Sequence, residues 1–516
     1  MRFDNVLAEI NGFGRFQLRT FLLLIIPRLT LPFNFLLNNF ITFIPSHHCD
    51  IRSQNNGGVF RNLSLEERLN VNIPFEQDGS LSSCQMFAEP QYQLLSNSSN
   101  LTYIPTMPCQ NGWIYDTTIF RSTLATEWDL VCDKKKMNRA TATIFFVGVM
   151  LGSGIFGFLS DRFGRKKTLL LSYMASFIFG IATALSYNFL MFATMRFCTG
   201  LGLSGISISS FVLCLEWVEI RHRTTVAVLM SLDWSVGCVI LPGVAYLIND
   251  WRFLTAAVIS PLFPAMLCWW WLPESARWLM SNGKTDDAHF YLSRCATVNG
   301  REDVLSTVIL VEDENRKYSY LDLVKTPKMR RRALLSVAFA YYGISLNISG
   351  FGVNIYLTQF IYGVIEIPAK GFVFFTVDKI GRRWNQAGML ILTGLLIFIF
   401  NLLINSVKTV GALGKMFSEG SFTIVFLYTT ELYPTVMRQN GLGYCSFMAR
   451  VGVAVSPLIM LLEDVWVNLP SFVFSLVALG SGLSASLLPE TYNVRLPETI
   501  EDVEQTTYCK TISLRL

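Results

Sequence analysis

Twelve apolar runs, each roughly as long as a membrane-spanning helix, take up most of this sequence of 516 residues. A helix needs about 20 mainly apolar residues to cross the hydrocarbon core of a bilayer. Charged residues account for only 15% of the chain, against about 25% in soluble domains, which excludes a soluble enzyme. We therefore expect an all-α membrane protein. The expected spans are 17–44, 141–160, 168–186, 189–213, 225–248, 254–272, 333–349, 355–377, 387–405, 409–430, 441–462 and 469–488.

Basic residues in the short connections predict the orientation of the spans. Lys and Arg are enriched in cytosolic loops, and here they cluster after spans two, four and eight and before span seven. Both termini and segment 273–332 are therefore expected in the cytosol, and segment 45–140 outside. The basic residues in question are Arg162, Arg165, Lys166, Lys167, Arg221, Arg223, Arg330, Arg331, Arg332, Arg382 and Arg383.

Segment 45–140 contains four cysteines and three Asn-x-Ser/Thr sequons. Disulfides and N-linked glycans form in the secretory pathway, so both features agree with an outer location. Four cysteines predict two disulfides with three possible pairings, among which the sequence does not choose. The cysteines are Cys49, Cys84, Cys109 and Cys132, and the predicted glycosylation sites are Asn62, Asn97 and Asn100.

Three motifs recur at nearly equal offsets along the chain, which indicates an internal duplication. Residues 161–166 correspond to 378–383, residues 216–223 to 431–438, and residues 273–275 to 489–491. Each copy contains six spans, so the two copies share one orientation and form a parallel repeat about an axis along the membrane normal. The expected units are a half at 1–272, which includes the outer loop, a cytosolic linker at 273–332, a second half at 333–488 and a tail at 489–516.

Several motifs resemble those of a known transporter family. The run GFLSDRFGRK at 157–166 is similar to the loop signature of the major facilitator superfamily, and PESARWL at 273–279 resembles the signature of its organic-ion branch. HHC at 47–49, TEWDLVC at 126–132 and FLYTTELYPTVMRQNGLG at 426–443 resemble solute carrier family 22, the organic anion and cation transporters.

This resemblance implies a fold of twelve transmembrane helices in two halves of six. It also implies secondary transport of amphipathic organic anions by alternating access, as exchange or facilitated diffusion. The implied substrates include prostaglandins, cyclic nucleotides, urate-like or dicarboxylate metabolites and anionic drugs. The implied location is the plasma membrane, in particular the basolateral membrane of kidney or liver epithelium.

Ionisable side chains deep in the spans are costly at mid-bilayer, so they are candidates for substrate binding. Arg450 in span eleven, which has no acidic residue within a helical turn, either attracts a substrate anion or has a structural role in hydrogen bonding. Family members that carry cations resemble this chain but hold an acid there, so the resemblance implies anions. Lys370 either contacts a substrate or counter-anion, or forms a buried pair with Glu366 one turn away. Arg28 either lines the pocket or has a partner within the bundle, and Asp233 is expected to balance one of the cations.

Four aromatic residues match positions that line the substrate cavity in related anion transporters, although aromatic residues at helical spacing are also common in simple packing. These are Tyr341, Tyr342, Phe422 and Trp234. Asn39, an uncharged polar residue within span one, is a further candidate for hydrogen bonding to substrate.

Six charged residues lie at the cytosolic ends of spans in the duplicated motifs. We interpret them as an interlocking conformational switch that holds the outward-open state and breaks when the halves rock. They are Asp161, Arg165, Glu216, Arg223, Glu431 and Arg438.

The sequence contains no phosphate-binding loop, HExxH or GxSxG motif, and its four histidines are scattered. We therefore expect no enzymatic activity, no cofactor and no metal. The expected partners are organic anions, a counter-anion and the lipid bilayer, without nucleic acid, and the functional unit is expected to be a monomer. Two alternatives remain: an organic cation or zwitterion carrier, which Arg450 opposes, and a transport-silent paralogue or splice form, because run 333–349 is short for a bilayer.

Overall fold

A computed structural model describes residues 3–505 apart from several gaps. The sequons Asn62, Asn97 and Asn100 lie outside the described residues, as do the side chains of Tyr341 and Tyr342. The gaps are 52–62, 77–78, 96–104, 302–324, 343–354, 403–407, 435–436, 461, 463–465, 467, 493, 495–496 and 498–499.

The first six predicted spans form the helices of an N-terminal half. Two spans are interrupted: the first consists of two helices in succession, and the sixth of two α-helices and a 3-10 turn. Pro27 and Pro32 lie inside the first of these helices. The elements are α2 (Arg15–Leu36) with α3 (Asn38–Ile41), α6 (Lys135–Phe163), α7 (Arg165–Ala184), α8 (Phe189–Glu216), α9 (Arg223–Leu247), and α10 (Trp251–Ile259) with α11 (Leu262–Cys268) and η6 (Trp269–Trp271).

Helices also occupy the other six predicted spans and form a C-terminal half. The seventh helix begins earlier than its apolar run, at Pro327, and the end of that run lies outside the described residues. Across the described chain, eight membrane-spanning candidates are long and apolar enough to cross a bilayer. The C-terminal helices are α15 (Pro327–Tyr342), α16 (Ile355–Ile380), α17 (Arg382–Leu402), α18 (Lys408–Leu432), α19 (Arg438–Met460) and α20 (Leu469–Ser486).

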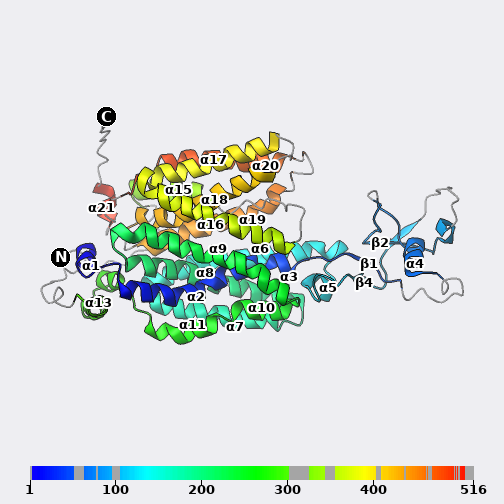
Figure 1. Cartoon of the computed structure of the whole chain (residues 1–516), viewed down its shortest axis with the longest axis horizontal. Helices are drawn as coiled ribbons and strands as arrows, with labels where there is room; N and C mark the ends of the chain where they lie inside the picture. The colour runs from blue at the N-terminus through cyan, green and yellow to red at the C-terminus, as the bar shows by residue number, and fades with distance from the viewer. Residues whose placement is uncertain are drawn as a thin grey trace.

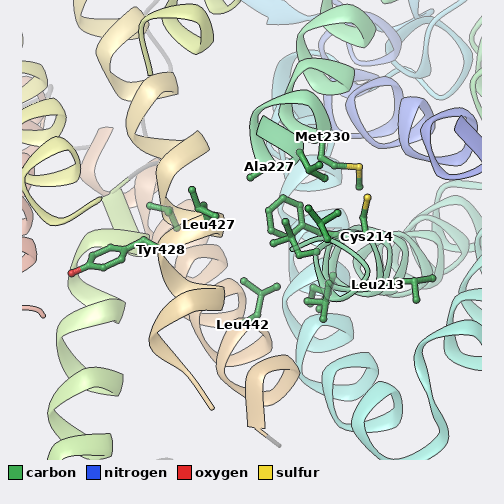
Figure 2. Packing of buried hydrophobic residues seen from close by; sticks show 14 of the residues in the cluster. Leu213, Cys214, Ala227, Met230, Leu427, Tyr428 and Leu442 are labelled. Carbon is green, nitrogen blue, oxygen red and sulfur yellow. The ribbon is translucent and has the colours of Figure 1, made fainter. Parts of the chain in front are cut away.

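The two halves lie side by side with their long helices roughly parallel (Figure 1). Their interface runs along two helix pairs, α6 against α19 and α9 against α16. Apolar side chains from both halves share one buried cluster. Leu213 and Met230 of the N-terminal half belong to this cluster together with Leu427 and Leu442 of the C-terminal half (Figure 2).

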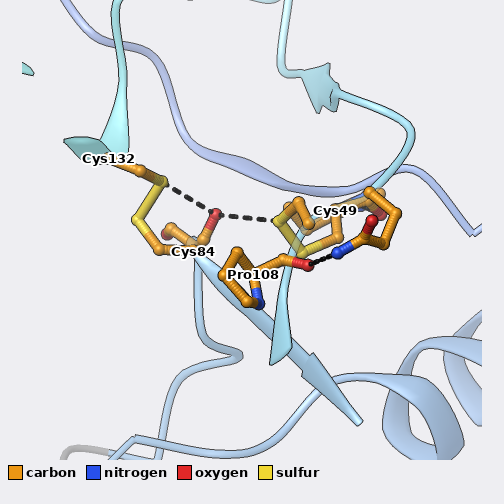
Figure 3. Close-up of a disulfide and its surroundings, with 8 residues drawn as sticks. Cys49, Cys84, Pro108 and Cys132 are labelled. Carbon is orange, nitrogen blue, oxygen red and sulfur yellow. Dashed lines mark hydrogen bonds between the residues drawn. A yellow bond between two sulfur atoms is a disulfide. The ribbon is translucent and has the colours of Figure 1, made fainter. Parts of the chain in front are cut away.

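Segment 45–140, which the sequence analysis expects outside the cell, forms a small lobe at one end of the bundle, opposite the two chain termini (Figure 1). Two disulfides, Cys49–Cys109 and Cys84–Cys132, hold it together (Figure 3). The structure thus provides the pairing that the sequence left open. The lobe contains the antiparallel pairs β1 (His47–Cys49) with β4 (Trp113–Tyr115) and β2 (Gln85–Phe87) with β3 (Thr106–Pro108), and the helical pieces α4 (Leu65–Asn72), η3 (Tyr92–Leu95), α5 (Leu124–Glu127) and η4 (Cys132–Lys134).

The lobe is fixed to the N-terminal half near its base. Glu127 of α5 forms an ion pair with Arg252 and accepts a hydrogen bond from the indole of Trp251, both at the start of α10. The backbone N–H of Arg121 donates to the carbonyl of Asn249 at 3.0 Å. The lobe and the turn between α9 and α10 are therefore joined by polar contacts.

Short helices cover the other end of the bundle. The part of the predicted linker that the structure describes is largely helical, and Asn299 at its end accepts a hydrogen bond from the backbone of Phe16 in α2. These helices are α1 (Phe3–Glu9), η5 (Ile220–His222), α12 (Ala276–Ser281), α13 (Thr285–Asn299) and α21 (Ile500–Gln505).

Candidate functional site

Arg450 extends from α19 across the interface between the halves. Its guanidinium carbon lies 4.8 Å from the ring centroid of Phe35 in α2 and 5.9 Å from that of Phe146 in α6. A cation over an aromatic face is stabilised electrostatically, although less than by a carboxylate. Among the residues that the structure describes, no ion pair involves Arg450 although it is only 7% exposed. The described partners of the Arg450 guanidinium are therefore aromatic rings, and its role toward substrate stays a prediction.

Aromatic rings continue from Arg450 along the same interface. Phe35 contacts Trp234 of α9 with ring centroids 5.5 Å apart, and Trp234 contacts Phe422 of α18 at 6.4 Å. Phe422 in turn lies 5.1 Å from Phe426. The structure thus places two of the predicted substrate residues, Trp234 and Phe422, in one aromatic group that includes rings from both halves.

Lys370 is buried in α16 and has partners on both halves. Its ammonium group donates to the carbonyl oxygen of Ser231, at 2.6 Å, and to the hydroxyl of Ser235, both on α9. Glu366 Oε2 lies 3.7 Å from the same ammonium group. The ion pair between Lys370 and Glu366, which lie four residues apart, is therefore present. The substrate role of Lys370 stays a prediction.

A second pair of charges, which the sequence analysis missed, lies near Lys370. Partly buried Lys415 and buried Glu419 form an ion pair one helical turn apart on α18. Their charges act on Glu366, so the two pairs form one group of four charges. The Lys-x-x-x-Glu spacing inside an apolar run was the available signal.

Arg28 pairs with Asp233, as the sequence analysis anticipated for one of the buried cations. The two side chains form an ion pair between α2 and α9, and Arg28 also donates to Ser210 Oγ at 3.1 Å and to the carbonyl of Met230 at 2.8 Å. Both members of this pair belong to the N-terminal half. A direct substrate contact by Arg28 stays a prediction.

Another buried arginine, Arg196 of α8, was missed by the sequence analysis. It donates to the side-chain oxygen of Asn34 at 3.1 Å and to the carbonyl of the same residue at 2.6 Å. Its guanidinium also lies over the ring of Phe145, 4.3 Å from the centroid. These partners are within the N-terminal half, so Arg196 serves the packing of that half.

Asn39 lies at the end of the interface nearest the lobe. Its amide donates to Gln359 Oε1 of α16 at 3.2 Å. The neighbouring Phe40 stacks on Tyr356, with centroids 5.8 Å apart. α3 and α16 thus join the two halves on the side of the lobe. A role of Asn39 toward substrate stays a prediction.

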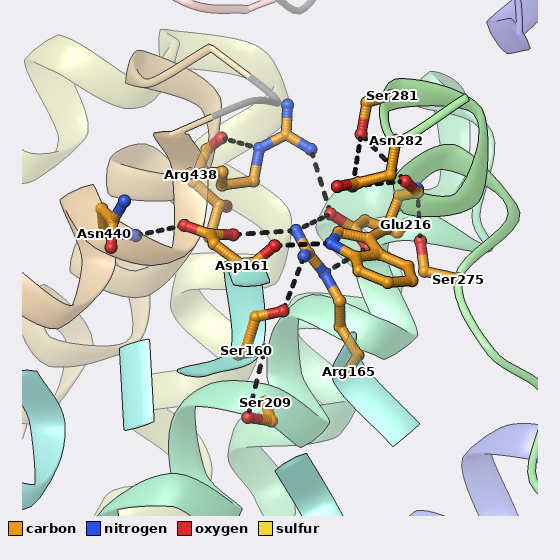
Figure 4. Close-up of polar contacts among 12 residues, drawn as sticks. Ser160, Asp161, Arg165, Ser209, Glu216, Ser275, Ser281, Asn282, Arg438 and Asn440 are labelled. Carbon is orange, nitrogen blue, oxygen red and sulfur yellow. Dashed lines mark hydrogen bonds and ion pairs between the residues drawn. The ribbon is translucent and has the colours of Figure 1, made fainter. Parts of the chain in front are cut away.

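Three predicted switch residues of the N-terminal half, Asp161, Arg165 and Glu216, meet at the end of the interface away from the lobe (Figure 4). Arg165 lies 3.1 Å from Glu216 and 3.2 Å from Asp161. Two groups from α19 complete the cluster: Arg438 lies 4.0 Å from Glu216, and the backbone N–H of Asn440 donates to Asp161 at 3.0 Å. Contacts between the halves therefore exist at both ends of the bundle.

An equivalent cluster lies at the end of the C-terminal half that is away from the lobe. Arg382 contacts Glu431 at 3.3 Å and Asp378 at 2.9 Å. Thr224 of α9 donates to Asp378 at 2.9 Å, which again joins the two halves. Arg223 lies close enough to Glu431 for its charge to act on that carboxylate. All six predicted switch residues thus lie in these two clusters.

Glu274 supports the first cluster from the segment between η6 and α12. Its carboxylate accepts hydrogen bonds from the backbone N–H groups of Arg165 at 3.0 Å, Lys166 at 3.1 Å and Ser275 at 2.9 Å. Burial raises the pKa of Glu274, while these N–H groups act in the opposite direction.

One group of metal-ligating types lies in the described part of the chain. The ligand atoms of His47, Cys84 and Cys132 are within 4.8 Å of one another. The two sulfur atoms are joined in a disulfide, so they are not available as thiolate ligands. This group is therefore part of the lobe's covalent framework.

Comparison with known proteins identifies the family. Residues 93–502 match the model of the sugar (and other) transporter family. The chain is 42% identical to solute carrier family 22 member 7 of Rattus norvegicus, over 98% of each chain. The chain belongs to solute carrier family 22. It is 43% identical to member 7 of Homo sapiens, over 98% of this chain and 96% of the relative, and 38% identical to member 6 of Danio rerio, over 100% and 96%.

Solved structures agree on the fold of this solute carrier. The proton:xylose symporter XylE, of the major facilitator superfamily, superposes with a TM-score of 0.62 at 16% identity, over 95% of this chain and 98% of the symporter. Its inward-open form from E. coli gives a TM-score of 0.56 at 17% identity, over 95% and 99%. The prediction of a twelve-helix major facilitator protein is confirmed, and the protein is a membrane transporter rather than an enzyme.

Proposed function

We propose that this solute carrier moves amphipathic organic anions across the plasma membrane by alternating access. The observation that supports this best is Arg450, a buried cation at the interface between the halves that rests on the ring of Phe35. An anion gains a charge-assisted contact there without first displacing a protein carboxylate. A cation would meet repulsion at the same place, which disfavours the alternative of an organic cation carrier.

The aromatic group suits the organic part of such a substrate. Flat rings stack or pack edge to face, and Trp234 and Phe422 come from opposite halves. A ligand held between them contacts both halves at once, as alternating access requires. The proposed substrates are prostaglandins, cyclic nucleotides, urate-like or dicarboxylate metabolites and anionic drugs, which all carry negative charge and differ in how much apolar area they offer to these rings.

Gradients are the proposed energy source. Moving a monoanion into a cell against an inside-negative potential costs about 2.3 kcal/mol per 100 mV. We infer exchange for an internal anion, or release down a concentration gradient. We further propose cytosolic termini, a glycosylated outer lobe and a functional monomer in the basolateral membrane of kidney or liver epithelium.

The test is uptake of a panel of labelled anions, cations and zwitterions into cells, with the amount of protein at the surface measured by biotinylation. We expect anion uptake by the wild type, loss of uptake with Arg450→Asp and partial retention with Arg450→Lys. Arg139→Asp makes the same charge change at an exposed position of α6 and is the control.

Three results would contradict the proposal. Unchanged anion uptake by Arg450→Asp at the surface would remove Arg450 from the site. Uptake of cations or zwitterions without anions would favour that alternative carrier. A wild-type chain at the surface that transports no member of the panel would favour a transport-silent protein.

A further inference from the structure

Ser235 lies between the two charges that α16 directs toward α9. Its side chain is fully buried, and its hydroxyl accepts a hydrogen bond from Lys370 while it donates to Glu366 Oε2 at 2.9 Å. A hydroxyl can donate one hydrogen bond and can accept others through its oxygen lone pairs. Ser235 therefore holds both charged groups at the same time.

Most of the hydrogen-bonding capacity of Lys370 is directed to the other half. An ammonium group has three protons, and two of them go to α9, to the carbonyl of Ser231 and to the hydroxyl of Ser235. Glu366 Oε2 lies 3.7 Å from the ammonium nitrogen. An incoming anion therefore competes for the ammonium group with the two acceptors on α9 and with the carboxylate of Glu366.

The backbone brings the two helices close enough for these short bonds. Gly363 lies on α16 about two turns before Lys370. A Cβ atom at Gly363 would lie 3.0 Å from the carbonyl carbon of Cys238 and 2.9 Å from a methyl group of Val239. Glycine thus permits the close approach of α16 to α9. At this short distance the side chain of Ser235 reaches both Lys370 and Glu366.

We propose that Ser235 is a positioning residue that keeps Lys370 bound to the N-terminal half until a substrate anion replaces it. The proposal rests on the anion transport proposed above and assigns Lys370 a role in coupling. Arg450 has no carboxylate to release and attracts the anion first. Lys370 then leaves Ser231 and Ser235 for the anion, the contact between α9 and α16 is weakened, and the loaded carrier changes state more readily than the empty one.

Ser235→Ala removes both hydrogen bonds of the hydroxyl, and Ser235→Thr keeps them. We expect Ser235→Ala to lower the half-saturation concentration for a labelled anion, because Lys370 has one acceptor fewer to give up. External anion should stimulate efflux of labelled anion from cells that express the wild type. Ser235→Ala should lose most of this stimulation, because the empty form of this variant also changes state. Ser235→Thr should restore both values toward wild type.

The control is Ser172→Ala, a buried serine whose hydroxyl donates to Thr168 within its own helix. All values are normalised to surface protein. Should Ser235→Ala fail to reach the surface, Ser235→Cys provides a variant of similar size with weaker hydrogen bonding, and the same two shifts are expected.

An unchanged half-saturation concentration together with unchanged stimulation would overturn the proposal, as would a fall in maximal rate alone. This failure differs from failure of the proposed function. In the first case the wild type still transports anions and Arg450→Asp still abolishes uptake, whereas in the second the wild type takes up no anion.

Discussion

Glu274 and Glu490 perform the same task in the two halves. Glu274 Oε1 accepts a hydrogen bond from the backbone N–H of Arg165 at 3.0 Å, and Glu490 Oε1 accepts one from Arg382 at 2.8 Å. Each arginine begins a helix, and a carboxylate at a helix N-terminus satisfies free N–H groups and the helix dipole. The duplication has therefore preserved an interaction between distant segments as well as a motif.

The glycines that precede these helices should not tolerate a side chain. Gly164 and Gly381 have φ angles of +100° and +92°, and a Cβ atom at either would lie 2.5 Å from Glu274 or Glu490. We expect Gly164→Ala and Gly381→Ala each to cost at least about 1–2 kcal/mol, because a non-glycine residue is strained at such angles. Thermal unfolding of the detergent-solubilised protein measures the effect.

Gly371→Ala is the matched control, since a Cβ atom there meets no atom within 4 Å and helical alanine is favoured over glycine. Equal melting temperatures for all three variants would show that the two helix starts are less constrained than the structure indicates.

The pair of Arg28 and Asp233 predicts a double-mutant result. Removing one member leaves a buried charge without its partner at a cost of about 3–5 kcal/mol. Arg28→Met and Asp233→Leu should each reduce stability and surface level, and the double variant should recover much of both. Thermal unfolding and surface biotinylation measure this recovery.

Uptake by the double variant then tests the substrate role of Arg28. Normal transport at the surface would make Arg28 purely structural, whereas a stable protein without transport would support a contact with substrate. Stability equally low in the double and single variants would contradict the pairing.

The disulfides predict which cysteine becomes reactive when its partner is removed. In Cys132→Ser, Cys84 should react with a membrane-impermeant maleimide added to intact cells, and Cys49 and Cys109 should not. Peptide mass spectrometry identifies the labelled site. Labelling of Cys49 or Cys109 in this variant would indicate another pairing.

The proposed outer location of segment 45–140 predicts N-linked glycans on the lobe. Treatment with a glycosidase should increase the gel mobility of the wild-type chain, and replacing Asn62, Asn97 and Asn100 together by Gln should abolish the change. A triple variant that still responds to the glycosidase would mean that another site is used and that the orientation must be revised.

Apolar length and repeated motifs were sufficient to predict the helices and the two halves. Both signals can be detected in a single sequence, because the length of an apolar run is a local property and the motifs repeat at a nearly constant offset. The limits are shown by Lys415 and Glu419, whose opposite charges one turn apart lie in a run that still reads as apolar. Span seven shows another limit, since α15 begins at Pro327, among basic residues outside the apolar run.

The sequence was sufficient to identify buried cations of the candidate site, but it did not identify most of their contacts. Depth in a span identified Arg450 and Lys370 as candidates, because a lone cation in lipid is costly. The partners of these residues depend on how the halves meet. The hydrogen bond between Lys370 and Ser235 joins residues 135 positions apart, and no spacing within one helix can indicate it.

The attachment of the outer lobe has a practical consequence for imaging. Glu127 fixes the lobe to Arg252 and Trp251 of the N-terminal half, so an antibody fragment raised against the lobe would move with that half. Most of this protein is hidden in a detergent micelle during electron microscopy, and its two halves resemble each other at low resolution. A fragment bound to the lobe would supply an asymmetric landmark that distinguishes them and aligns the particles.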